Sequence, residues 1–144
     1  MVEMTGDPLR VVSRREAAIV VTGASSGIGR EIARLAAQEG SFVLLVARSQ
    51  IALDALAGEL AGAGAVCAAL PLDLGRPGSA QAIDTALASR GLFCDVLVNS
   101  AGYGLFGPSA VLDEHSQIDI LDVNARALTS LSLHFLPGML ERGR

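Results

Sequence analysis

The chain has 144 residues, of which 51% are hydrophobic and 18% charged, and its formal net charge is −4. This length suits one domain with a well-filled core, and it leaves little chain for a second domain. The cations are scattered arginines without a basic stripe, and no apolar run approaches the roughly 18 residues of a membrane helix, so we expect neither nucleic-acid nor membrane binding.

Residues 1–16 mix charged residues with short apolar pieces, so they lack a signal peptide's apolar segment and are predicted to form a loose leader. Cys67 and Cys94 fall in apolar runs, and His115 and His134 have no partners at metal or triad spacing. Buried, reduced thiols are typical of cytosolic proteins, with a disulfide as the less favoured alternative. We therefore expect a cytoplasmic protein without a metal site.

Apolar runs bounded by turn residues recur at 17–22, 42–47, 65–72 and 94–98, and stretches of helical periodicity lie between them. Nearly unbroken apolar strands, each followed by a helix, predict a parallel sheet covered by helices on both faces. With right-handed crossovers, the strand order becomes 3-2-1-4. The sequence thus predicts an α/β fold, a Rossmann-type doubly wound sheet of about four strands and four helices, with residues 17–144 as a dinucleotide-binding domain.

The predicted helices show faces and ends that can be checked. In the first helix, Ile28, Ile32 and Leu35 share one face, and Gly40 can end the helix in the left-handed conformation. Ser49 can cap the second helix.

The last predicted helix runs from about residue 113 to residue 137 and carries an apolar face. Such a face predicts either core packing or a subunit interface, and we expect a homo-oligomer. Its members are Leu128, Leu131, Phe135 and Met139.

The stretch Thr22-Gly23-Ala24-Ser25-Ser26-Gly27-Ile28-Gly29 directly follows the first apolar run. Glycines at the end of a parallel strand let the backbone turn tightly and let a pyrophosphate approach without a Cβ clash. The free N–H groups at the start of the next helix favour the negative charge of that pyrophosphate. Gly23, Gly27 and Gly29 therefore predict a phosphate cradle, although a glycine triplet alone also fits a simple tight connection.

The residue after the second predicted strand distinguishes between two dinucleotides. A carboxylate about 20 residues beyond the glycines binds the ribose 2′-hydroxyl of NAD, whereas a basic residue suits the additional phosphate of NADP. Here Arg48 lies about 19 residues beyond Gly29, and no carboxylate is available at that strand end. Because a guanidinium can bind a phosphate through two parallel hydrogen bonds, we expect NADP rather than NAD. A solvated arginine at a helix start is the alternative.

Asp73 follows the third apolar run, at the sheet edge where ligands of open α/β sheets collect. Its carboxylate can hold the adenine amino group, or it can cap the next turn. The sequence favours neither role over the other.

With these residues considered together, the chain resembles the short-chain dehydrogenase/reductase family. The resemblance is carried by the glycine turn together with Asp73-Leu74, Leu97-Val98-Asn99-Ser100-Ala101-Gly102 and Asp122-Val123-Asn124-Ala125. It implies that Ser25, Ser26 and Ile28 line the pyrophosphate and the adenosine phosphate. It also implies that Asp73 and Leu74 flank the adenine, and that Asn99, Ala101 and Gly102 pack beside the cofactor ribose. Ser100 departs from a second asparagine common in the family motif.

The resemblance assigns a catalytic role to Asn124, whose carbonyl side supports the proton-relay water behind the family's catalytic lysine. A serine and a Tyr-x-x-x-Lys pair complete that site, with tyrosine as general acid and lysine lowering its pKa. This chain contains no lysine, and its only tyrosine, Tyr103, is followed four positions later by Gly107. Tyr103 is instead expected to border the nicotinamide or the substrate. We expect an incomplete fold, truncated before these catalytic residues.

Two functions remain open on this basis. The first is an NADP-dependent short-chain oxidoreductase that moves hydride between nicotinamide and a small carbonyl or alcohol substrate, present as its cofactor-binding half and inactive alone. The second is a catalytically dead dinucleotide-binding or subunit-interaction module. The second is less favoured, because an exposed fourth strand and an unpartnered last helix are prone to association.

Overall fold

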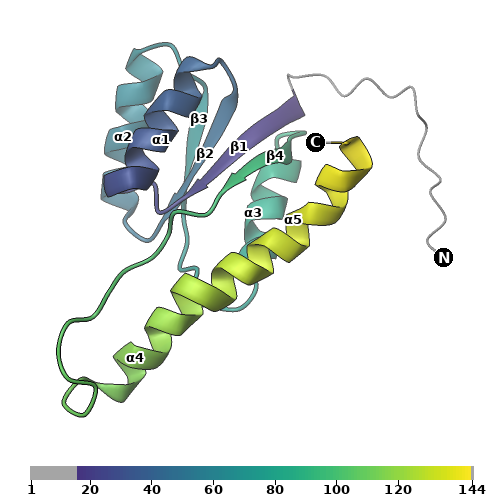
Figure 1. The fold of residues 1–144 in the computed structure, drawn as a ribbon. Helices are drawn as coiled ribbons and strands as arrows, with labels where there is room; N and C mark the ends of the chain where they lie inside the picture. The colour runs from purple at the N-terminus through teal and green to yellow at the C-terminus, as the bar shows by residue number, and fades with distance from the viewer. Residues whose placement is uncertain (1–15, 144) are drawn as a thin grey trace, which may run out of the picture.

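A computed structural model describes residues 16–143 of the chain. Four strands form one parallel sheet in the order β3-β2-β1-β4 (Figure 1). Their bounds are β1 Ala17–Thr22, β2 Phe42–Ala47, β3 Cys67–Pro71 and β4 Phe93–Val98. The predicted Rossmann-type sheet with strand order 3-2-1-4 is confirmed, whereas all but the last residue of the predicted leader lie outside the described part of the chain.

Helices cover both faces of this sheet. On one face lie α1 (Gly27–Gln38) and α2 (Gln50–Gly62), and on the other lie α3 (Ser79–Ala88) and α5 (Leu128–Arg142) (Figure 1). The last helical segment begins with α4 (Glu114–Leu121) and passes through a π-helical turn, η2 (Asp122–Ala127), into α5. Its α4 end projects beyond the sheet, and α4 buries none of its residues (Figure 1). No helix in residues 16–143 is both long and apolar enough to cross a membrane.

The core lies in two layers because successive side chains of a strand point to opposite faces of the sheet. Val20 and Leu44 face α3 and α5, whereas Val21 and Leu45 face α1 and α2. All four side chains are essentially inaccessible to solvent. Cys94 is buried and Cys67 half-buried, and both are free thiols, as the sequence predicts.

The start of α1 packs against the glycine turn through its backbone. The predicted apolar face is not the one that packs, since Ile28 and Leu35 are 75% and 61% exposed. The buried residues of α1 are small, namely Gly29, Ala33, Ala36 and Ala37. A Cβ on Gly29 would lie only 2.4 Å from the carbonyl oxygen of Gly23, so the helix approaches the turn too closely for larger side chains. Close backbone contact therefore selects the buried face.

Two predicted helix ends are confirmed, and a third is wrong. The Ser49 hydroxyl accepts the Ala52 N–H at 3.3 Å and caps α2, and Gly40 adopts the left-handed conformation after α1. The last helix does not stop at Pro137 but continues to Arg142. The guanidinium of Arg142 donates to the Cys94 carbonyl at 2.7 Å and lies over a β4 ring, and these contacts hold the turn beyond the proline.

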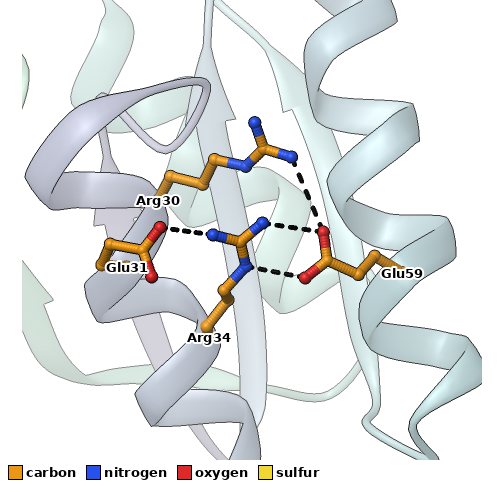
Figure 2. A network of polar contacts seen from close by, with 4 residues as sticks. All are labelled: Arg30, Glu31, Arg34 and Glu59. Atoms are coloured by element: carbon orange, nitrogen blue, oxygen red, sulfur yellow. Dashed lines mark hydrogen bonds and ion pairs between the residues drawn. The ribbon is translucent and has the colours of Figure 1, made fainter.

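A cluster of charged side chains joins α1 to α2 (Figure 2). Arg34 donates from Nε and Nη2 to the two carboxylate oxygens of Glu59, at 2.7 and 2.9 Å. Arg34 also contacts Glu31, and an Arg30 nitrogen lies 3.6 Å from Glu59. The side chains are partly exposed, so solvent screens these pairs and their contribution to stability is small.

The Glu59 carboxyl makes the α1–α2 cluster sensitive to acid. Hydrogen bonds from Arg34, together with the charges of Arg34 and Arg30, hold the pKa of Glu59 below its ordinary value. A carboxyl with a depressed folded-state pKa adds stability above its unfolded pKa, and this stability is lost as the pH falls through the folded pKa. We therefore expect Glu59→Gln to destabilise the fold slightly at pH 7 and to have a smaller effect at about pH 3, below the ordinary pKa of a glutamate.

Urea unfolding at the two pH values measures this difference. Asp119→Asn is the control, because Asp119 is exposed on α4 and has no partner among the contacts of the described residues. An equal loss of stability for Glu59→Gln at both pH values would contradict the lowered pKa of Glu59 in the folded protein.

Candidate functional site

A cavity of about 550 Å³ opens where the loops after the four strands converge. This is the carboxyl edge of the sheet, beside the switch point between β1 and β4, where ligands of open α/β sheets bind. The wall contains most of the predicted binding residues, namely Gly23, Ser25, Ser26, Gly27, Ile28, Arg48, Asp73, Leu74, Ala101 and Gly102. It also contains Ala47, Leu72, Ser100, Tyr103 and Val123. Three predicted residues, Gly29, Asn99 and Asn124, do not line it.

The glycine turn brings three backbone segments into contact below the cavity. Gly23 has a φ of +68°, and a Cβ there would lie 2.7 Å from the carbonyl oxygen of Ser100. Gly29 supports the wall from underneath, because it packs on Gly23. At the start of α1, Ser26 makes no side-chain capping bond, and the first turn has no acidic residue. This helix start can therefore offer backbone N–H groups to an anion.

Thr22 ties the end of β1 to the loop after β4, a role that the sequence analysis missed. Its side chain is buried, and its hydroxyl donates to the Val98 carbonyl at 3.1 Å. The same oxygen accepts the N–H groups of Ser100 and Ala101, at 3.1 and 3.2 Å. A threonine at a strand end also suits the strand itself, so the sequence carries no separate signal for this bridge.

Asp73 caps the turn after β3. Its Oδ1 accepts the Gly75 N–H at 3.0 Å, and its Oδ2 lies 3.4 Å from Arg76 Nε. Asp73 also lines the cavity beside Leu74. The capping role is therefore present in the structure, and the carboxylate stands where it can contact a ligand as well.

The two predicted asparagines contact neighbouring segments. Asn99 Nδ2 donates to Ser132 Oγ at 3.1 Å, which connects the end of β4 to α5. Asn124 Oδ1 accepts the Tyr103 N–H at 3.1 Å, and its Nδ2 donates to the Tyr103 carbonyl at 2.8 Å. Asn124 lies in η2, and π-helical turns are frequent at functional sites. Its side chain fixes the backbone of the loop after β4.

The sheet order and the position of the cavity define a Rossmann-type α/β protein. Residues 17–144 match the model of the short chain dehydrogenase family. The chain therefore belongs to this family, as its motifs predict.

Individual relatives support this assignment. A short chain dehydrogenase from Pseudocercospora fijiensis is 35% identical over 127 residues, which cover 85% of this chain and 40% of that protein. Among solved structures, a metagenomic short-chain oxidoreductase in complex with NADP has a TM-score of 0.84 at 35% identity, over 92% of this chain and 61% of that one. The L-sorbose reductase from Gluconobacter frateurii, complexed with NADPH and L-sorbose, has a TM-score of 0.80 at 31% identity. That match covers 88% of this chain and 48% of the reductase. The chain thus spans roughly half the length of such relatives.

Proposed function

We propose that residues 17–144 are the cofactor-binding domain of an NADP-dependent short-chain oxidoreductase, which transfers hydride between nicotinamide and a small carbonyl or alcohol. The observation that supports this most is the cavity at the carboxyl edge of the sheet, because it combines a glycine turn, an arginine and the start of a helix. Relatives of similar fold carry NADP or NADPH in their solved structures.

The cavity residues fit the parts of a dinucleotide. The glycine turn with Ser25, Ser26 and Ile28 would hold the pyrophosphate, since Gly27 lines the cavity and has open space where a Cβ would stand, so an anion can approach its backbone. Asp73 and Leu74 would flank the adenine. Arg48 is exposed on the cavity wall and would bind the 2′-phosphate. Gly29 and Asn99 would act by holding this wall in place.

The bound nicotinamide would supply or accept the hydride, and proton transfer needs groups from the protein. We propose that Asn124 belongs to that proton relay. The chain has no lysine, so we propose that it binds the cofactor but is inactive alone. Reading the coding sequence beyond residue 144 tests whether the chain is the cofactor-binding half of an oxidoreductase. An open frame without a serine and a Tyr-x-x-x-Lys motif would contradict it.

Arg48 provides a direct test of the preference for NADP. We expect Arg48→Ala to weaken NADPH binding by about 10- to 100-fold, because a charge-assisted hydrogen bond contributes about 1.5–3 kcal/mol. NADH binding should change by less than about threefold, because NADH lacks the 2′-phosphate. Fluorescence titration of both nucleotides measures the difference.

Arg90→Ala is the matched control for this test. Arg90 lies just beyond the end of α3, where its guanidinium donates to the Ala86 carbonyl, and it does not line the cavity. Equal weakening of NADPH and NADH by Arg48→Ala would remove Arg48 from the phosphate site.

A specific observation favours the alternative of a binding module that associates with other subunits. On α5, Leu133, Leu136 and Leu140 are 64%, 45% and 69% exposed. Such a surface favours association, and we propose that the protein forms a homo-oligomer through it. Light scattering of the purified chain tests the oligomer, and an assay with ketones and NADPH tests turnover. Stable NADPH binding without turnover, from an open frame that ends at residue 144, would favour the module.

A further inference from the structure

Arg48 and Tyr103 face each other on the wall of the cavity, although they come from loops after different strands. The central guanidinium carbon of Arg48 lies 5.9 Å from the centroid of the Tyr103 ring. This distance is within the range over which a cation is attracted to an aromatic face. The contact places the Tyr103 ring beside Arg48, so the ring borders the part of the cavity at which we propose that the 2′-phosphate binds, in contrast to the expectation from the sequence that it borders the nicotinamide or the substrate.

Arg48 has few other constraints. The residue is exposed, and among residues 16–143 no hydrogen bond or ion pair of its side chain is found. An exposed arginine samples many rotamers, and it loses this freedom when it binds a phosphate. A ring that holds the guanidinium near its binding position reduces that loss. Within the described part of the chain, no carboxylate forms an ion pair with Arg48, so the guanidinium stays available to an anion.

The Tyr103 ring itself needs a fixed support, because the residues that follow it, 104–111, are all exposed. The support comes from Asn124, whose side-chain amide forms hydrogen bonds to both the N–H and the carbonyl of Tyr103. The preceding residue is also close, since a Cβ on Gly102 would lie 3.1 Å from Asn124 Oδ1. Contacts from η2 thus hold the loop at the point where the ring begins.

We propose that Tyr103 is a positioning residue that strengthens the preference for a 2′-phosphorylated nucleotide by holding Arg48 at the cavity wall. The proposal rests on the function proposed above, in which Arg48 binds that phosphate. It assigns Tyr103 a role in cofactor selection that requires the ring and does not require the hydroxyl. It also gives Asn124 a second role, because its side chain fixes the backbone from which the ring extends.

The test measures dissociation constants of NADPH and NADH by fluorescence titration. For Tyr103→Leu we expect NADPH binding to weaken by about two- to fivefold, the range of an exposed cation–π contact, with NADH changed less. Tyr103→Phe keeps the ring, so it should bind NADPH like the unchanged chain. In an Arg48→Ala background, Tyr103→Leu should no longer affect NADPH more than NADH, because the ring acts through Arg48.

Several outcomes would overturn the proposal. One is equal weakening of both nucleotides by Tyr103→Leu, and another is a selective loss that persists without Arg48. A loss of selectivity in Tyr103→Phe would assign the effect to the hydroxyl instead. If the leucine variant does not fold, as judged by circular dichroism, Tyr103→Gln provides a second side chain without a ring. If the unchanged chain binds neither nucleotide, both the proposed function and the role of Tyr103 are rejected. If the chain binds NADPH selectively and loss of the ring does not change this, only the role of Tyr103 is rejected.

Discussion

Replacing Gly29 with alanine is expected to destabilise the domain by about 3 kcal/mol or more and to abolish nucleotide binding, although it adds a single methyl group. The added Cβ would lie 2.4 Å from the carbonyl oxygen and 2.8 Å from the carbonyl carbon of Gly23. Both are backbone atoms of the turn, so no side chain can rotate away to make room. Either α1 or the turn must move, and this movement would open the wall of the cavity.

Gly58→Ala makes the same chemical change in α2, but we expect it to increase the stability of the domain. Gly58 is exposed within the helix, and a Cβ there would meet nothing within 4 Å. Alanine favours the helical backbone over glycine, so this variant should gain about 0.5–1 kcal/mol. Urea unfolding of both variants, with NADPH titration of each, provides the comparison. Gly29→Ala unfolding at the same urea concentration as the unchanged chain would show that the close approach is not rigid.

Most of the fold could be predicted from the sequence, but the close approach of Gly29 to Gly23 could not. The apolar runs identify the strands because burial on both faces requires nearly continuous apolar residues, and chain connectivity then determines the order 3-2-1-4. Periodicity fails at α1 because it considers only apolar character. It selects Ile28 and Leu35, whereas contact between Gly29 and Gly23 requires small residues on the inner face. Steric limits of this kind depend on tertiary geometry that the pattern does not contain.

The candidate site also has features that can be predicted from the sequence and features that cannot. Backbone turns, as at Gly23, and charge at a strand end, as at Arg48, can be recognised in a sequence because each requires a particular residue type. The supporting contacts cannot be recognised in this way. Asn124 forms hydrogen bonds to the backbone of Tyr103. Because nearly all residue types have the same backbone groups, the identity of residue 103 does not indicate this contact. Such contacts become visible only when the loop after β4 and η2 are placed together.

Thr22 is the clearest case of such a contact, and its replacement by valine is the second large effect that we expect. Valine has nearly the same shape, but it cannot accept the N–H groups of Ser100 and Ala101 or donate to the Val98 carbonyl. Leaving such part-buried groups without partners costs about 1–3 kcal/mol. We expect Thr22→Val to lose about 2 kcal/mol of stability and to weaken NADPH and NADH binding together, because Ala101 belongs to the cavity wall.

Thr22→Ser separates the hydroxyl from the methyl group, because it keeps the three hydrogen bonds of Thr22 and removes only a buried methyl. It should therefore lose about 1 kcal/mol and bind nucleotides almost normally. Hydrogen exchange of the Ser100 and Ala101 amides reports on the bridge directly, because local opening exposes these groups. Their protection should fall in the valine variant and persist in the serine variant. Unchanged protection in Thr22→Val would mean that the loop after β4 is held by Gly23 and Asn124 instead, and nucleotide binding should then survive the loss of the hydroxyl.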